Sequence, residues 1–307
     1  MKKILVINYS QSGQLDEIID NFLLPFEAAL IDRIKIFPKK PYPFPWTSKE
    51  FFNTMPESVL EEKNELVPIN FQSTDYDLVI VGYQPWYLSP SIPTTSLFHN
   101  EKFLLLLKDK PVVTIIGARN MWLNSQERIK EFIHNAGGSL VGNIPLIDKT
   151  NNTISAITIL DWMLSGKKKR YLKIFPLPGI SEKDIKSANV FGEIVFRAFS
   201  EKSYIGLQKK ILDTGLIRIG TDVLFIELRG KKIFLKFASL IKRKGTTAGK
   251  RTFYVKLFKY YLLIAMFFVA PVVLPIYYLF VRPFQIASIK RKKQYFCGVK
   301  RKEKQNE

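Results

Sequence analysis

The sequence predicts an α/β protein built on a doubly wound, parallel sheet of five strands. Short apolar runs rich in β-branched residues alternate with helical patterns through the first half of the chain. Three of these runs lead directly into polar loops that contain glycine. Such alternation is typical of a parallel sheet with right-handed crossover helices. Strands that are apolar throughout indicate a sheet covered on both faces.

The apolar runs place the five strands at residues 3–7, 28–37, 78–81, 112–116 and 139–147. Two intervening segments have helical patterns. Residues 15–24 carry apolar side chains at helical spacing. Residues 125–138 are expected to form a helix that starts at Ser125 and ends at the glycine pair 137–138. Residues 38–57 are rich in proline and aromatic side chains, and we expect no regular element there.

Composition divides the rest of the chain. We predict a sheet domain, a partly helical basic accessory region, an apolar membrane segment and a basic tail, at residues 1–165, 166–256, 257–284 and 285–307. In the accessory region, Ser181 and Asp184 form a variant of the capping box and predict the start of a helix.

Charge is concentrated at the C-terminal end. The 307 residues carry a net charge of +20, and residues 229–307 hold 20 lysines and arginines against two acids. The first 228 residues have a net charge of only +2. The single cysteine, Cys297, excludes an intrachain disulfide and a thiolate cluster. With only two histidines besides, no metal site is expected, and a reducing compartment fits.

The loop after the first strand is suited to a phosphate group. It offers hydroxyls, amides and a glycine from Ser10, Gln11, Ser12, Gly13 and Gln14. Such donors at a helix N-terminus bind a phosphate dianion without a cation. The loop contains neither the G-x-G-x-x-G nor the G-K-[ST] motif, which excludes the common dinucleotide and triphosphate loops. The alternative is that the two serines only cap the helix.

The three loops resemble, in order, those of the flavodoxin-like family. The stretch "SQSGQ" resembles the phosphate loop, with Leu15 in place of the usual threonine, so one hydroxyl contact is missing. "GYQPWYLSPSIP", residues 82–93, resembles the second flavin loop, and "GARNMW", residues 117–122, resembles the third. The resemblance covers about the first half of the chain and implies FMN as cofactor.

The resemblance also implies a set of FMN-binding residues. They are Ser10, Gln11, Ser12, Gly13, Gln14, Leu15, Gln84, Pro85, Trp86, Tyr87, Gly117, Ala118, Arg119, Asn120 and Trp122. A flat flavin ring needs stacking surfaces, which Trp86, Tyr87 or Trp122 would supply, although these aromatics also suit a core. Arg119 would face the flavin pyrimidine or an acidic substrate, or else form a surface salt bridge.

An apolar run near the C-terminus predicts membrane attachment. Residues 260–281 contain 22 residues without a charge, ~33 Å as a helix, against ~30 Å of bilayer hydrocarbon. Pro271 and Pro275 interrupt the run, and both flanks are basic. We therefore expect a kinked, re-entrant or interfacial anchor at the cytoplasmic face of the inner membrane, in which residues 257–307 bind lipids.

Two other interpretations of this region are open. A buried core helix would also be apolar, but the run is long and flanked by basic clusters. Nucleic-acid binding would use the same positive charge, but these charges bracket an apolar run and form no stacking platform. We expect no nucleic-acid partner.

The chain resembles more closely the flavin-dependent aromatases of bacterial dialkylresorcinol biosynthesis, also called dialkylresorcinol condensing enzymes. The opening "MKKILVINYSQSGQL", the flavin loops, the aromatic segment 38–57 and the basic C-terminal anchor carry this resemblance. It implies oxidation of a hydrophobic dialkylcyclohexanedione, supplied by a ketosynthase partner, to a dialkylresorcinol. FMN would accept the hydride, and an external acceptor would reoxidise it. We expect segment 38–57 to line a pocket for the alkyl chains of the substrate.

The catalytic residues are not identified by any motif. Tyr83, Tyr87 and His99 are candidates for proton transfer or carbonyl binding. A membrane-bound NAD(P)H:quinone reductase and a flavodoxin-type electron carrier are the alternative functions. The near-neutral charge of the first 228 residues counts against the carrier, because soluble carriers commonly present an acidic surface.

Overall fold

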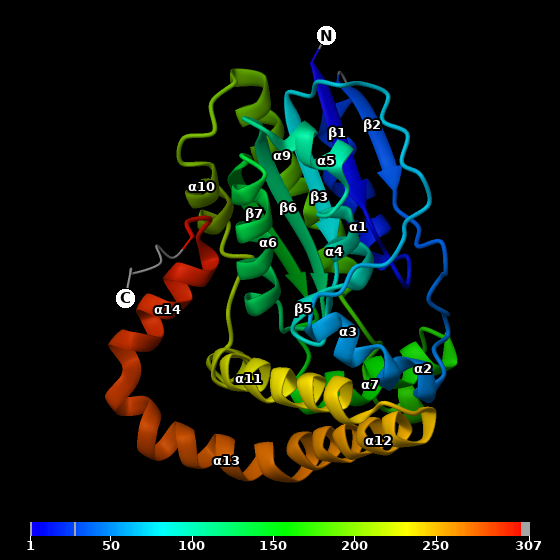
Figure 1. Ribbon diagram of the computed structural model, residues 1–307. Helices are drawn as coiled ribbons and strands as arrows, with labels where there is room; N and C mark the ends of the chain where they lie inside the picture. The colour runs from blue at the N-terminus through cyan, green and yellow to red at the C-terminus, as the bar shows by residue number, and fades with distance from the viewer. Residues whose placement is uncertain (1, 28, 302–307) are drawn as a thin grey trace, which may run out of the picture.

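The computed structural model describes residues 2–27 and 29–301. Its centre is a parallel sheet of five strands in the order β2-β1-β3-β6-β7 (Figure 1). The strands are β1 (Lys3–Asn8), β2 (Leu30–Lys35), β3 (Leu78–Tyr83), β6 (Pro111–Ala118) and β7 (Ser139–Ile147). The chain winds outward in both directions from β1, which is the doubly wound order of flavodoxin-like sheets. The predicted fold class is confirmed.

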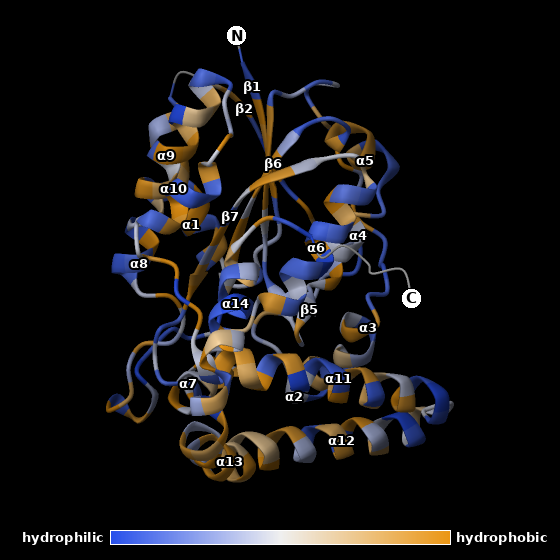
Figure 2. Cartoon of the chain, turned by 90° about the vertical axis from the view of Figure 1, so that its left-hand side faces the viewer, coloured by the Kyte–Doolittle hydropathy of each residue, from blue (hydrophilic) through white to orange (hydrophobic). Residues whose placement is uncertain are grey.

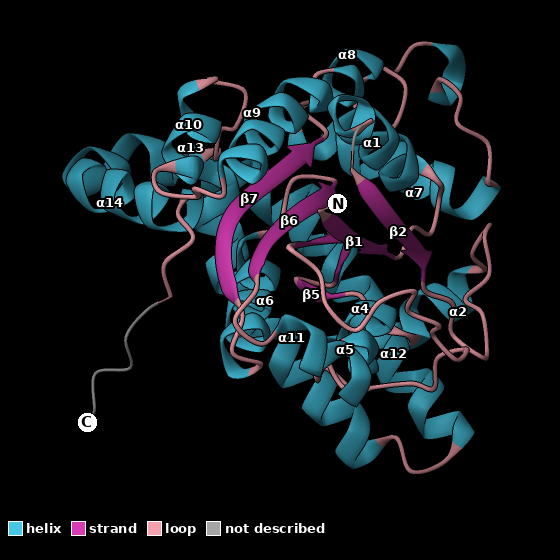
Figure 3. Cartoon of the chain, turned by 90° about the horizontal axis from the view of Figure 1, so that it is seen from above, coloured by secondary structure: helices cyan, strands magenta, loops and turns pink. Residues whose placement is uncertain are grey.

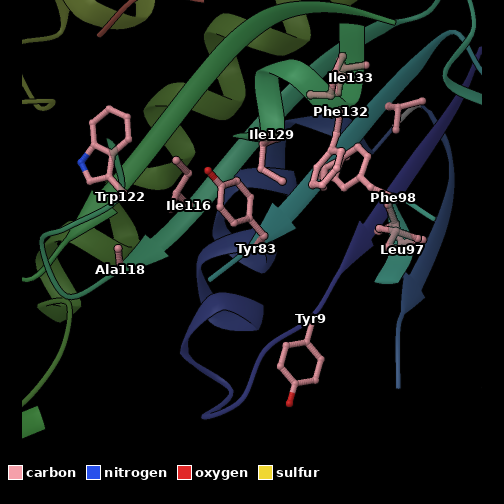
Figure 4. Close-up of a cluster of buried hydrophobic side chains, with 14 of the residues drawn as sticks. Tyr9, Tyr83, Leu97, Phe98, Ile116, Ala118, Trp122, Ile129, Phe132 and Ile133 are labelled. Carbon is pink, nitrogen blue, oxygen red and sulfur yellow. The ribbon is translucent and has the colours of Figure 1, made fainter. Parts of the chain in front are cut away.

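Helices cover both faces of this sheet (Figure 3). One layer consists of α1 (Gln14–Leu23), α8 (Glu182–Lys186), α9 (Ala188–Glu201) and α10 (Leu207–Asp213). The other consists of α4 (Ile92–Leu97), α5 (Glu101–Leu107) and α6 (Leu123–Asn135). Successive strand side chains alternate between the layers, so β1 buries Ile4 and Val6 on one face and Leu5 and Ile7 on the other. Figure 4 shows part of the core on the face that α4, α5 and α6 cover, which is called the second core below.

Helix α9 completes the first layer, although it lies far along the chain in the region predicted to be accessory. It packs beside α1 through Phe191, Val195 and Phe199. A Cβ added at Gly192 would lie 2.0 Å from the carbonyl oxygen of Phe22, so glycine is required for the two backbones to approach this closely. This part of the accessory region therefore belongs to the sheet's own core.

One predicted helix start is wrong and another is confirmed. Helix α6 begins at Leu123 rather than Ser125, and Ser125 is fully buried inside its first turn. The start is instead capped from a distant helix, by Glu227, whose carboxylate accepts a hydrogen bond from the Asn124 amide. The Ser181 hydroxyl oxygen does cap α8, at 3.1 Å from the Asp184 amide nitrogen.

The aromatic segment 38–57 is more regular than expected. It contains α2 (Ser48–Asn53) and the start of α3 (Met55–Val59). Thr47 and Glu50 form a variant of the capping box, in which the Glu50 backbone amide donates to the Thr47 hydroxyl at 3.1 Å and that hydroxyl donates to the Glu50 carboxylate at 2.6 Å. The high proline and aromatic content masked this local signal.

Two long helices lie across the carboxyl ends of the strands (Figures 1 and 2). Helix α11 (Thr221–Lys244) and helix α12 (Ala248–Ile264) form a hairpin. A third buried cluster fastens this hairpin to α2 and α3, through Phe52, Met55, Val59, Ala238, Ile241, Val255 and Phe258. The short antiparallel strands β4 (Pro85–Trp86) and β5 (Ser89–Pro90) lie nearby, and so does α7 (Asn152–Ser165). Short 3₁₀ helices also form at η1 (Leu24–Phe26) and η2 (Tyr171–Lys173).

The apolar C-terminal run is a bent helical chain. After α12 it continues as η3 (Ala265–Val269), α13 (Ala270–Ile276), η4 (Tyr277–Val281), η5 (Arg282–Gln285) and α14 (Ile286–Cys297). The two π-helical turns, η3 and η4, flank the proline-containing α13, as expected where prolines remove backbone donors. Beyond α13 the run bends, and α14 turns back along the body (Figure 1).

By length and composition, this run qualifies as a membrane helix. Ala248–Cys297 spans 50 residues, its most apolar window has a mean hydropathy of 2.3, and 6% of that window is buried. The run is attached to the body near both ends. Phe258 is fully buried against α11, and Phe296 of α14 is 5% exposed in the second core. Between these contacts many apolar side chains are exposed, although Tyr277 is 5% exposed and packs on Phe225 of α11 with ring centroids 4.0 Å apart.

Candidate functional site

A cavity of about 490 Å³ lies at the carboxyl ends of β1, β3 and β6. Ligands of doubly wound sheets bind at this edge, where the strand order reverses. All three loops singled out in the sequence contribute to its wall. The predicted FMN-binding residues that line it are Gln11, Ser12, Gln14, Leu15, Gln84, Pro85, Trp86, Tyr87, Gly117, Ala118 and Arg119. The fold thus brings together most of the residues that the sequence predicted.

The first loop forms an uncapped helix start. Gly13 precedes α1 with a φ of 85°, and no side chain caps the helix. A Cβ at Gly13 would meet nothing within 4 Å, so there is open space beside the backbone. The Ser10 hydroxyl is buried and has no hydrogen-bond partner among the described residues, and Ser12 lines the cavity. The unpartnered Ser10 hydroxyl beside an uncapped helix start fits an acceptor-rich ligand at this turn.

The two glutamines of the loop have structural contacts. The backbone amide of Gln11 donates to the Gln84 side-chain oxygen at 2.8 Å, and this bond connects the first loop to the second. The Gln11 side chain donates to the carbonyl oxygen of Pro43 at 2.8 Å. The Gln14 side chain pairs with both backbone groups of Ile180, at 2.9 and 3.1 Å. Both side chains therefore hold neighbouring segments around the cavity.

Aromatic side chains form one wall. The Trp86 ring packs edge-on against Trp46 and Tyr42, with centroids 5.4 and 5.0 Å away. Trp46, Phe51 and Phe52 from segment 38–57 also line the cavity. Edge-to-face packing of this kind restricts the orientation of these rings in the cavity wall.

Arg119 supplies positive charge to the cavity wall. Its guanidinium donates to the carbonyl and side-chain oxygens of Asn152 at 3.0 and 2.8 Å, and its other terminal nitrogen lies 3.9 Å from the Met121 sulfur. Within residues 2–27 and 29–301 it forms no salt bridge, contrary to one of our expectations. Burial lowers the pKa of Arg119 to about 10, so the side chain stays protonated at neutral pH.

Four of the predicted FMN-binding residues do not line the cavity, namely Ser10, Gly13, Asn120 and Trp122. The first two lie in the backbone turn described above. The Asn120 amide donates to the Asn152 side chain at 2.7 Å and helps to position it beside Arg119. Trp122 is 1% exposed and belongs to the second core, so core packing is its role in the fold (Figure 4).

Of the three catalytic candidates, only Tyr87 lines the cavity. Its hydroxyl donates to the Phe51 carbonyl oxygen, and burial raises its pKa well above 10. Tyr83 is fully buried in the core, where its hydroxyl donates to Gln126 at 2.6 Å (Figure 4). His99 is exposed, and its ring contacts the Thr95 carbonyl oxygen at 2.8 Å. Tyr83 and His99 therefore lie outside the cavity.

The floor of the cavity was not predicted. It is built by α7, α11 and the run from α12 to α13, including Ile159, Leu160, Ile226, Ile233, Met266 and Val273. Gly179 also belongs to the wall, with a φ of +83°, and a Cβ there would lie 2.8 Å from the Trp162 ring. The helical spacing of apolar residues in 152–165 and 221–244 was the available sequence signal, but it does not say which surface a helix covers.

Glu227 attaches α11 to the start of α6. One carboxylate oxygen accepts hydrogen bonds from the Asn124 amide at 2.8 Å and from its side chain at 3.2 Å. The other oxygen is buried without a partner among the described residues. Burial raises the pKa of Glu227 from 4.5 to about 7. The contact helps to hold the floor helix beneath the loops.

This raised pKa predicts that stability falls as pH rises. The folded state holds the Glu227 proton more tightly than the unfolded chain, so the free energy of unfolding should drop between pH 4.5 and 7. The expected drop is about 3 kcal/mol, from about 1.4 kcal/mol per pKa unit. Chemical denaturation across this range should show a flatter pH profile for Glu227→Gln, while Glu193→Gln, at an exposed position, should keep the wild-type slope.

Strand order and cavity position define the chain as an α/β protein of flavodoxin-like fold. Among solved structures, it is similar to a flavoprotein in complex with FMN from Lactobacillus acidophilus NCFM, at 15% identity and a TM-score of 0.40, covering 47% of this chain and 93% of that one. A candidate flavoprotein from Bacteroides eggerthii DSM 20697 has 18% identity and a TM-score of 0.38, covering 54% and 100%. A flavodoxin from the domain Archaea has 12% identity and a TM-score of 0.34, covering 64% and 99%. No protein-family model and no curated protein matches the chain.

Proposed function

We propose that this chain is a membrane-associated, FMN-dependent oxidoreductase that aromatises a dialkylcyclohexanedione to a dialkylresorcinol. The observation that carries the proposal is the composition of the cavity. A phosphate-type helix start, aromatic walls and a half-buried arginine lie at one end, and a largely apolar floor lies at the other. One cavity would therefore hold both a flavin and a hydrophobic substrate. A ketosynthase partner would supply the dione.

The residues present fit FMN. The orphaned Ser10 hydroxyl, the Ser12 hydroxyl and the uncapped amides of α1 would hold the phosphate. Asp16 lies in the first turn of α1, but its carboxylate pairs with Lys35 at 3.1 Å, which offsets its charge. The ring would lie between the second and third loops, against Trp86. FMN bound there would accept a hydride from the substrate.

The residues that line the cavity suit an acidic substrate. A cyclic 1,3-dione carries a proton between two carbonyl groups and ionises readily to an enolate. Arg119 and Arg229 line the cavity and would stabilise that negative charge. Among the described lining residues there is no carboxylate and no histidine, so binding the preformed anion removes the need for a strong base there. Overall the ring loses one hydride and one proton and becomes aromatic.

Exposed apolar side chains favour binding to a bilayer. The stretch from η3 to η5 presents Phe268, Val269, Val272, Val273, Ile276, Leu279, Phe280, Val281 and Phe284, all at least 37% exposed. Basic side chains flank the stretch on both sides, and each would add ~1 kcal/mol near anionic lipid. Because both flanks pack on the body, we propose that the stretch lies in one leaflet, at the cytoplasmic face of the inner membrane.

Anaerobic mixing with a dialkylcyclohexanedione tests the reaction. The oxidised flavin band should bleach in a single turnover and the resorcinol should appear, without any nicotinamide cofactor. Readmitted oxygen should restore the colour. The apolar floor would equally suit a quinone, so an NAD(P)H:quinone reductase is the second candidate. Its flavin would bleach with NAD(P)H and stay oxidised with the dione, and that result would replace the aromatase proposal.

A further inference from the structure

The cavity changes character along its length. At the sheet it is lined by polar and charged groups, among them Ser12, Gln84 and Arg119. Away from the sheet it runs between α11 and α13, where Ile233, Leu263 and Val273 line it. A ligand that satisfies both ends must have a compact polar head and a long apolar chain.

The apolar end reaches the outer surface beside α13. Val269 and Val273 line the cavity, yet 49% and 37% of their surfaces are exposed, which places them at its mouth. Val272, next to Val273 on the same helix, does not line the cavity and is 60% exposed. Helix α13, which belongs to the exposed apolar stretch, therefore contributes to the wall of the cavity with one side and is exposed on another. Figure 2 shows α13 as largely hydrophobic at the edge of the molecule.

We propose that the cavity takes up a long-chain amphiphile directly from the bilayer, through the mouth beside Val269 and Val273. The head would lie towards Arg119 and the chain between α11 and α13. The mouth lies within the apolar stretch, so a chain that enters there never crosses water. This inference rests on the proposed membrane association and is independent of the proposed aromatisation.

The distribution of tryptophan makes the proposal measurable. The chain has four tryptophans, none beyond residue 162, so the apolar stretch has none. Trp46, Trp86 and Trp162 line the cavity, and Trp122 lies in the core. A brominated acyl chain quenches indole fluorescence only at contact range. Quenching by a brominated fatty acid in the bilayer therefore reports entry into the cavity.

The experiment compares vesicles of phosphatidylglycerol and phosphatidylcholine that contain either stearic acid or 9,10-dibromostearic acid. For the wild-type protein, the brominated chain should lower tryptophan fluorescence at least about twofold relative to stearic acid. Val273→Phe narrows the mouth and should remove most of this quenching. Val272→Phe is the matched control, with the same change one residue away, and should keep it. Ala270→Phe narrows the same mouth and should act like Val273→Phe.

Sedimentation of each variant with the vesicles shows whether it is still bound. A bound wild-type protein that shows no quenching would overturn the proposal, and so would equal quenching in the Val272 and Val273 variants. A wild-type protein that fails to sediment would refute both this inference and the membrane association on which it rests. Failure of the dione to bleach the flavin would refute the aromatase and leave this result standing.

Discussion

Replacement of Ser12 by aspartate should lower FMN affinity about 1,000-fold. The new carboxylate would face the phosphate dianion in a turn whose donors are hydroxyl and amide groups. Two unit charges 4 Å apart repel by about 4 kcal/mol at an effective dielectric constant of 20. Purified wild-type protein should be yellow and release FMN on denaturation, whereas the variant should be colourless. Quenching of flavin fluorescence during titration of the apoprotein measures both affinities.

Ser181→Asp is the control for this substitution. Ser181 caps α8 through its hydroxyl, and aspartate is an equally good cap, so the fold and the flavin should be retained. If Ser12→Asp binds FMN with the wild-type affinity, the phosphate does not lie at this turn. A wild-type protein that is colourless and takes up no FMN at micromolar concentration would rule out the cofactor itself.

The double variant Phe268→Asp, Phe280→Asp should lose membrane binding. The two side chains are 71% and 68% exposed, and neither lines the cavity. Transfer of each phenylalanine out of the bilayer costs about 1.5–3 kcal/mol, so the pair should weaken partitioning at least about 100-fold. The new carboxylates also repel anionic lipid. Flavin content should stay unchanged, because the substitutions are remote from the loops.

Co-sedimentation with anionic vesicles at low and high salt is the measurement. The wild-type protein should stay bound at 1 M salt, since apolar insertion survives the screening that removes charge attraction. Ile205→Asp serves as the control, because Ile205 is apolar and 91% exposed but lies just before α10, outside the apolar stretch. Release of the wild-type protein by salt alone would show that the stretch is not inserted.

Much of the sheet could be predicted because its signals are local. Leu78–Tyr83 is apolar at every position, and a strand buried on both faces needs this. The phosphate-type turn was likewise readable, since Ser10, Ser12 and Gly13 are close in sequence and act through their own backbone. The common position of the three loops could also be predicted, because the carboxyl ends of parallel strands lie at the same edge of a sheet.

Contacts between distant residues could not be predicted. Glu227 caps α6 although it lies about 100 residues further along the chain. The sequence around Asn124 contains no signal that predicts this cap. Trp122 and Trp86 follow strand ends in the same way, but one lies in the core and the other lines the cavity. Residues of α6 and of segment 38–57 determine whether each tryptophan lies in the core or at the cavity. The positions of these residues depend on how the layers pack.

The sequence by itself determined the doubly wound sheet, the three loops at its edge and an apolar, basic C-terminal end. These are properties of residue patterns a few positions long, which bias the backbone wherever they occur. Only the tertiary structure decided that α9 completes the helical layer beside α1 and that α11 to α13 close the cavity from below. Both arrangements depend on side chains that meet only after the chain has folded, and a helix's apolar stripe does not encode its partner.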